Sequence, residues 1–231
     1  MITTKAEIHM QKEISESLYL ISVTLQRYKQ WIPGMFMQIS LKERTASEPW
    51  LDGHSFSFAS WGSEEALVLV RREGSFTTAL VQRSIEGFTT SVRYPFGDFM
   101  LNSSKGKVFL AGGAGISVFL SYLDYISLAK NDLEEVLLLH TAKRKSESVR
   151  NIYSKDISKS ISILQYITNR DEPSYTGRPT IEDLKNNISD LSENDYFLCG
   201  PLGFNSYWYD HLKEIGVSPK VEQWENVVRA E

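Results

Sequence analysis

The 231-residue sequence has one cysteine, Cys199, which excludes an internal disulfide and a cysteine-ligated iron–sulfur cluster. Its histidines (His9, His54, His140 and His211) do not have the spacing of metal ligands. No apolar run approaches the roughly 20 residues needed to cross a bilayer, and residues 1–10 have no apolar signal core. These absences predict a soluble cytoplasmic protein without a metal site.

The sequence also lacks an excess of positive charge. Lys and Arg number 25, Asp and Glu number 29, and the net charge is −4. A protein that binds nucleic acid by neutralising phosphates is therefore not expected. The hydrophobic content of 42% supports substantial cores, and the length fits one large domain or two ordinary ones. No pattern indicates an oligomeric state.

The first hundred residues are rich in strand patterns. Apolar positions alternate along residues 17–26, as in a strand of a half-buried sheet, and Pro33-Gly34 marks a turn. Further strand candidates are residues 35–41, 54–60 and 66–72. Short strands separated by turns predict a barrel or a sandwich.

Beyond the polar break at residues 102–106, strands and helices alternate. Strand candidates are 108–111, 136–140, 161–167 and 196–199; the last helix runs through Phe204, Trp208, Leu212 and Ile215, and Thr180 with Asp183 can cap another. This alternation predicts a five-stranded parallel sheet covered on both faces. We expect domains at residues 1–102 and 106–231, with the active site between them.

A glycine-rich turn follows the first of these strands. Gly112, Gly113 and Gly115 come directly after the apolar run, and Ile116 begins a helical spacing of apolar residues. A strand, glycine turn and helix together favour pyrophosphate binding, because backbone N–H groups at the helix start face the ligand. The spacing differs from the dinucleotide pattern G-x-G-x-x-G, so a plain tight turn is the alternative.

Several motifs, read in order, resemble those of the ferredoxin–NADP reductase superfamily. Residues 54–60 (HSFSFAS) are similar to R-x-Y-S-x-x-S, and residues 74–77 (GSFT) to G-x-x-[ST]. Residues 94–97 (YPFG) are similar to the turn G-P-[FY]-G, and residues 112–117 (GGAGIS) to G-G-x-G-[IV]-[TS]-P. Residues 199–201 (CGP) and 222–224 (EQW) match C-G-P and E-x-[FYW]. The resemblance implies a flavin-binding β-barrel followed by an α/β parallel-sheet domain that binds a nicotinamide nucleotide.

The sequence departs from these motifs at three places. His54 replaces the motif arginine, and a histidine is a weaker, pH-dependent phosphate ligand. Its H-x-F-S is similar to H-P-F-[ST] of the ferric reductase and NADPH oxidase branch. Val118 replaces a proline, and Gly34-Met35 replaces G-Q. Of the properties that the resemblance implies, flavin affinity is the one that these departures affect most.

On the flavin side, the resemblance implies that Ser57 hydrogen-bonds the flavin N5 and that Phe56 packs the flavin. His54 faces the pyrophosphate, and the turn of Gly74, Ser75, Phe76 and Thr77 donates to phosphate. The alternatives are that Ser57 is a strand serine bonded to backbone, that Phe56 is a core aromatic residue and that His54 is an exposed histidine. For residues 74–77 the alternative is an ordinary helix cap.

On the nucleotide side, the resemblance implies a pyrophosphate site at Gly112, Gly113, Gly115, Ile116 and Ser117. Cys199, with Gly200 and Pro201, lies beside the nicotinamide, and Trp224 stacks on the flavin. Ser57, Cys199 and Trp224 are the candidate catalytic residues. Lys143, Asn169 and Arg170 would hold a 2′-phosphate, which favours NADPH over NADH. The alternatives are that Cys199 is a small buried hydrophobic residue, that Trp224 is a packing anchor, and that the three 2′-phosphate candidates are solvated loop residues.

Three functions remain open from the sequence. The first is an FAD-dependent NAD(P)H reductase that passes electrons to a separate acceptor, either a protein or a small molecule. The second is a flavin or ferric reductase that uses loosely bound flavin as a substrate. The third is a non-catalytic nucleotide-sensing module on the same fold.

Overall fold

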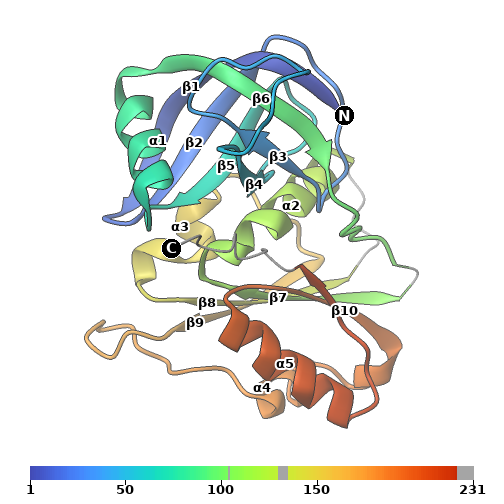
Figure 1. Cartoon of the computed structure of the whole chain (residues 1–231). Coiled ribbons are helices and arrows are strands. Elements are labelled where there is room, and N and C mark those ends of the chain that lie inside the picture. The colour runs from blue at the N-terminus through green and yellow to red at the C-terminus, as the bar shows by residue number, and fades with distance from the viewer. Residues whose placement is uncertain (104, 130–134, 223–231) are drawn as a thin grey trace.

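The computed structural model describes residues 1–103, 105–129 and 135–222, and these form two sheets stacked one above the other (Figure 1). The upper sheet is antiparallel and the lower one parallel. The predicted fold class, a β-barrel followed by an α/β domain, is confirmed. The position of the domain boundary stays a prediction.

The antiparallel sheet has the strand order β4-β3-β6-β1-β2-β5. Its elements are β1 (Ile2–Ser15), β2 (Leu18–Leu25), β3 (Phe36–Ile39), β4 (His54–Ser57), β5 (Glu65–Arg71), α1 (Ser75–Glu86) and β6 (Phe88–Phe96). A bridge between Phe58 and Val68 joins the segment after β4 to β5. The two edges of the sheet thereby meet, and the sheet closes into a barrel.

The barrel interior follows from alternation along the strands. In β1, Ala6 and Ile8 are buried while Lys5 and Glu7 are exposed. The predicted half-buried character of residues 17–26 is wrong, because both faces of β2 are buried. Tyr19, Ile21 and Val23 fill the barrel, whereas Leu18 and Leu20 pack into a core shared with the second layer.

The parallel sheet has the order β11-β10-β7-β8-β9. Its elements are β7 (Gly106–Gly112), η1 (Gly113–Ile116), α2 (Ser117–Ala129), β8 (Val136–Ala142), η2 (Lys145–Glu147), α3 (Val149–Ile152), β9 (Ile161–Ile167), α4 (Ile181–Lys185), η3 (Leu191–Glu193), β10 (Asn194–Cys199), α5 (Leu202–Glu214) and β11 (Lys220–Glu222). Helix α2 lies between the sheet and the barrel, and α4 and α5 cover the other face (Figure 1).

Other predictions of local structure can be compared directly. The Thr180–Asp183 cap is confirmed, since Asp183 accepts hydrogen bonds from the Thr180 backbone N–H at 2.6 Å and hydroxyl at 2.9 Å. The strand-only pattern of the first hundred residues is wrong at α1. The expected turn at residues 94–97 is wrong in part, because residues 94–96 end β6 and only Gly97 turns, with φ of 97°.

The barrel and the parallel layer share one hydrophobic core. The Phe99 ring, just after the barrel, lies 6.0 Å from the ring of Phe197 on β10. The Trp61 ring lies 5.0 Å from that of Tyr125 on α2, and its backbone N–H donates to Asp124 at 3.3 Å. This continuity fixes how the two layers face one another. Among the described residues, no helix has the length and apolar content needed to span a membrane.

Candidate functional site

One group of candidate residues gathers where β4 meets the start of α1. The His54 ring lies parallel to the Phe76 ring, with centroids 3.8 Å apart and an interplanar angle of 13°. The Phe56 ring lies 6.3 Å from Phe76. Phe56 and Ser57 are buried and His54 is exposed. His54 and Phe56 are two residues apart on β4, so they share one face of the strand, and Phe76 neighbours both rings.

The first turn of α1 is organised by its own residues. Gly74 is the N-cap, and the Thr77 hydroxyl oxygen accepts from the N–H groups of Glu73 at 3.0 Å and Gly74 at 3.1 Å. The Thr77 hydroxyl donates in turn to the Gly74 carbonyl at 3.3 Å. Thr77 thus closes the helix start, while the first helical N–H groups have no partner within the helix. A Cβ on Gly74 would meet nothing within 4 Å, so this end is open to a ligand.

A second group forms where β7 and β10, which are neighbours, both end. Gly115 packs against the Cys199 carbonyl so closely that a Cβ would collide with it. A Cβ on Gly200 would lie 3.0 Å from the Gly112 Cα, and a Cβ on Gly112 would lie 2.9 Å from the Phe204 ring. These glycines are needed because the two turns pack backbone against backbone.

The glycine turn itself is a short 3-10 helix, η1, that leads into α2. Gly113 has φ of 56°, a left-handed conformation that favours glycine. Ser117 begins α2, and its hydroxyl oxygen is buried with no hydrogen-bond partner among the described residues. A buried polar atom normally has a partner. The start of α2 therefore offers an unsatisfied hydroxyl beside backbone N–H groups.

A buried histidine on the neighbouring strand contacts the backbone of this turn. His140 on β8 is fully buried, with its Nε2 3.1 Å from the Gly113 carbonyl oxygen and its Nδ1 3.2 Å from Gln165 Oε1. Burial lowers the pKa of His140 and outweighs the hydrogen bonds to Gly113 and Gln165. Nothing in the sequence marks this role, because a single histidine at the end of a leucine run has no spacing signal.

The candidate 2′-phosphate residues lie on two neighbouring loops that follow β8 and β9. The backbone N–H of Asn169 donates to the Lys143 carbonyl at 3.2 Å, and that of Thr168 to the Ala142 carbonyl at 2.9 Å. The side chains of Lys143 and Arg170 are exposed. The structure therefore brings these predicted residues together at the carboxyl edge of the sheet.

A half-buried carboxyl group, Glu222, ends β11 directly beside Cys199 in the parallel ladder. Burial raises the pKa of Glu222 to about 7, with a smaller contribution from the negative charge of Asp98. Asp98 follows the last barrel strand, so the pair spans the junction of the layers. In the sequence, Glu222 is marked only as the first residue of the E-x-[FYW] motif. Trp224 lies outside the described residues.

The predicted residues thus form groups in different layers: the His54 and α1 group in the barrel, and the glycine, cysteine and loop groups on the parallel sheet. The described residues contain no cluster of three or more His, Cys, Asp or Glu side chains placed to hold a metal ion. All the sheet groups lie where its strands end, which is where open α/β sheets bind ligands.

No family model matches the chain. A flavohemoprotein of Bordetella pertussis is 23% identical over 221 residues, which cover 87% of this chain and 54% of that protein. A 2-halobenzoate 1,2-dioxygenase electron transfer component of Burkholderia cepacia is 26% identical over 179 residues, which cover 74% of this chain and 51% of that protein. The chain therefore spans about half the length of the curated relatives it matches.

Solved structures show the same architecture. Flavohemoglobin from Malassezia yamatoensis, with bound FAD and heme, has a TM-score of 0.79 at 18% identity and covers 96% of this chain and 60% of its own. A ferredoxin NADP+ reductase from Neisseria gonorrhoeae, with bound FAD and NADP, has a TM-score of 0.72 at 19% identity and covers 93% and 92%. The expected resemblance to the ferredoxin–NADP reductase superfamily is confirmed in the fold.

Proposed function

Because the chain has the two-domain fold of the ferredoxin reductases, we propose that it is an FAD-dependent NAD(P)H reductase that passes electrons to a separate acceptor. FAD and NADPH are the cofactors, with NADH as the alternative donor. The observation that carries this is the close fit of the turn at Gly112–Gly115 against Cys199-Gly200, beside the Ser117 hydroxyl, which has no partner in the part of the chain that the structure describes.

The barrel residues fit a flavin with its phosphates. The open helix start at Gly74 supplies N–H groups for an anion, and the exposed His54 ring lies directly against Phe76 in that first turn. Phe56, on the same face of β4 as His54, belongs to the barrel core and packs beneath the site with Phe76. Ser57, buried at the end of β4, would donate its hydroxyl proton to a ring nitrogen of the flavin.

The sheet residues fit a nicotinamide dinucleotide. Ser117 and the N–H groups that begin α2 would hold its pyrophosphate, and Lys143, Asn169 and Arg170 a 2′-phosphate. Charge-assisted bonds from Arg170 would select NADPH over NADH. Cys199 would lie beside the nicotinamide as a small buried side chain, and we place no nucleophilic chemistry on it.

When both cofactors are bound, they supply hydride transfer and one-electron release. The residues of this chain orient the two rings and exclude water from the junction. Ser57 stabilises the accepting nitrogen. Glu222, whose pKa is raised to about 7, would hold a proton at its carboxyl oxygen below that pH. Trp224 remains a proposed cover for the flavin.

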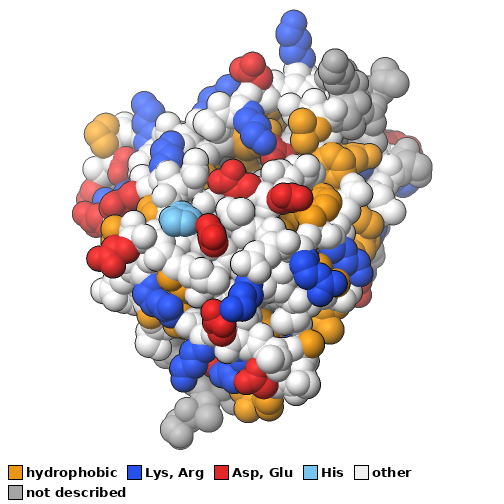
Figure 2. Space-filling view, turned by 90° about the horizontal axis from the view of Figure 1, so that it is seen from above, with side chains coloured by type: hydrophobic (Ala, Val, Ile, Leu, Met, Phe, Trp, Pro, Cys, Tyr) orange, Lys and Arg blue, Asp and Glu red, His pale blue; other side chains and the backbone are white. Residues whose placement is uncertain are grey.

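The acceptor is separate from the chain in this proposal. Figure 2 shows acidic and basic side chains mixed over the face seen from above, so charge on that face does not mark a docking surface. Reduction of free flavin or ferric complexes is the second candidate, and His54 in place of arginine favours it. Retention of flavin during purification separates the two functions.

The test is an absorbance spectrum of the purified protein, followed by anaerobic titration with NADPH and with NADH. We expect a bound flavin spectrum that NADPH bleaches at lower concentration than NADH does. A colourless protein that oxidises NADPH only with added flavin would support the second candidate. A protein that oxidises neither nucleotide with any acceptor would contradict both and leave the non-catalytic module.

A further inference from the structure

A buried ion pair joins the barrel to the parallel layer. Arg71, at the end of β5, donates from Nη1 and Nη2 to the two carboxylate oxygens of Glu147 in η2, each at 2.9 Å. Glu147 is 2% exposed and also accepts from the Ser15 hydroxyl at 2.6 Å. Arg71 Nη1 donates further to the Ser17 hydroxyl at 2.9 Å. This bidentate geometry fixes both the orientation of the guanidinium relative to the carboxylate and the distance between them.

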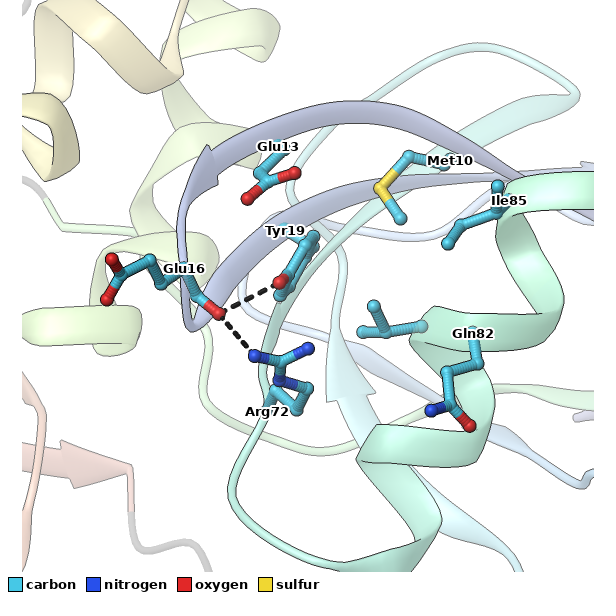
Figure 3. A pocket seen from close by; sticks show the side chains of 8 residues that line it. Met10, Glu13, Glu16, Tyr19, Arg72, Gln82 and Ile85 are labelled. Carbon is cyan, nitrogen blue, oxygen red and sulfur yellow. Dashed lines mark hydrogen bonds between the residues drawn. The ribbon is translucent and has the colours of Figure 1, made fainter.

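The barrel side of this contact is the tight turn between β1 and β2. The Glu16 carbonyl in this turn accepts from the Tyr19 hydroxyl and from Arg72, each at 2.8 Å, as the dashed lines in Figure 3 show. The turn forms one wall of a hollow of about 530 Å³ against α1. Lys12 reaches across to the Asn151 carbonyl at 2.6 Å. These hydrogen bonds hold the turn in place where it contacts the second layer.

The parallel-layer side leads from Glu147 to the glycine turn. Two residues after Glu147, the Val149 N–H donates to Gln165 Oε1 at 3.0 Å. Gln165 Nε2 donates to the His140 carbonyl at 3.1 Å, and the His140 ring contacts the Gly113 carbonyl. A Cβ on Gly113 would lie 3.9 Å from Arg71 Nη2, so the guanidinium also lies alongside the turn.

We infer that Glu147 is a positioning residue: through Arg71 it holds the glycine turn at residues 113–117 in a fixed relation to the flavin-binding barrel. The orientation of the nucleotide toward the flavin depends on that relation, so this inference rests on the proposed function. Neither side chain needs to touch a reacting atom. Misplacement of about 1 Å lowers a transfer rate by about a hundred-fold, so the effect falls on the transfer step.

Removal of one partner alone would leave a buried unpaired charge and destabilise the protein. The test therefore uses the double variant Arg71→Met/Glu147→Leu, which replaces the pair by apolar side chains, together with Glu147→Gln. The control is Glu16→Gln, which neutralises an exposed carboxylate at the same junction, 3.5 Å from Arg144. Folding and flavin content are measured first, by thermal unfolding and absorbance.

In stopped-flow reduction by saturating NADPH, we expect the double variant to lose at least about ten-fold in rate constant, with NADPH affinity changed less than about three-fold. Glu147→Gln should fall between it and the parent protein, and Glu16→Gln should match the parent. A weaker charge-transfer absorbance with oxidised nucleotide should accompany the slower rate. A double variant as fast as the parent would overturn the inference.

Hydrogen–deuterium exchange provides a readout that needs no activity. In the protein without nucleotide, we expect faster exchange at residues 113–117 and 145–152 in the double variant and no change in Glu16→Gln. Unchanged exchange in both segments would overturn the inference even if the parent is an active reductase. If the flavin of the parent protein bleaches with neither nucleotide, but the double variant still exchanges faster than the parent in these segments, the proposed function is contradicted and the inference is not.

Discussion

His54 is the position where one substitution separates the two candidate functions. Its ring is exposed and stacks on Phe76 at 3.8 Å, at the open start of α1. Arginine there would carry a permanent positive charge and could donate two parallel N–H bonds to a phosphate. The variant His54→Arg should therefore bind FAD more tightly than the parent, and the gain should persist at alkaline pH.

The size of the gain follows from two opposing contributions. A hydrogen bond to a charged group contributes about 1.5–3 kcal/mol, and ordering the long arginine side chain on binding costs about 0.5–1.5 kcal/mol. The net is about 1 kcal/mol, or roughly five-fold in the dissociation constant of FAD. Riboflavin, which has no phosphate, should bind the two proteins equally.

The assay is a titration of the flavin-free protein with FAD, followed by fluorescence quenching and repeated with riboflavin. His54→Gln is the matched control, since it removes the ring without adding charge, and it should bind FAD no more tightly than the parent. If His54→Arg leaves FAD affinity unchanged, or tightens riboflavin to the same extent, His54 does not face the phosphates.

The remaining predictions concern other residues of the site. Ser57→Ala should slow flavin reduction more than it weakens flavin binding, and equal reduction rates in stopped flow would count against its role. Arg170→Ala should weaken NADPH binding about ten- to hundred-fold and leave NADH nearly unchanged; the exposed Lys185→Ala serves as control, and an equal loss for both nucleotides would make Arg170 structural. Because the pKa of Glu222 is raised to about 7, the unfolded chain releases this proton first, and stability should fall as pH rises from about 5 to about 7; in urea unfolding, Glu222→Gln should lack that slope. Burial alone would raise the pKa of Glu147, but hydrogen bonds from Arg71 and Ser15 hold it below the ordinary value of 4.5, so stability should be lost as pH falls below that value, and less steeply in Glu147→Gln.

The fold could be predicted because its patterns are local. The change from strand patterns to alternating strands and helices corresponds to a change of sheet, since the last antiparallel strand, β6, ends at Phe96 and the first parallel strand, β7, begins at Gly106. The Thr180 cap was visible because a capping pair spans only three residues. The sequence indicates α1 only through the alternative of a helix cap at residues 74–77, because residues that resemble a phosphate-binding turn and residues that begin a helix share the same local pattern.

The contacts that complete the site are not local. Gly115 and Cys199 are 84 residues apart, and only the pairing of β7 with β10 places one against the other. The ion pair of Arg71 with Glu147 joins two layers, and nothing in either neighbourhood marks a partner. Both faces of β2 are buried because the second layer covers the barrel, which alternation within β2 cannot reveal.

We propose that hydride passes from a nicotinamide nucleotide to a flavin where the two layers meet. The most direct measurement is anaerobic stopped-flow reduction of the FAD-loaded protein by NADPH, compared with NADPH deuterated at the transferred position. We expect loss of the flavin absorbance, with a slower rate for the deuterated nucleotide. A protein that holds FAD, yet keeps its absorbance with both NADPH and NADH, would contradict it.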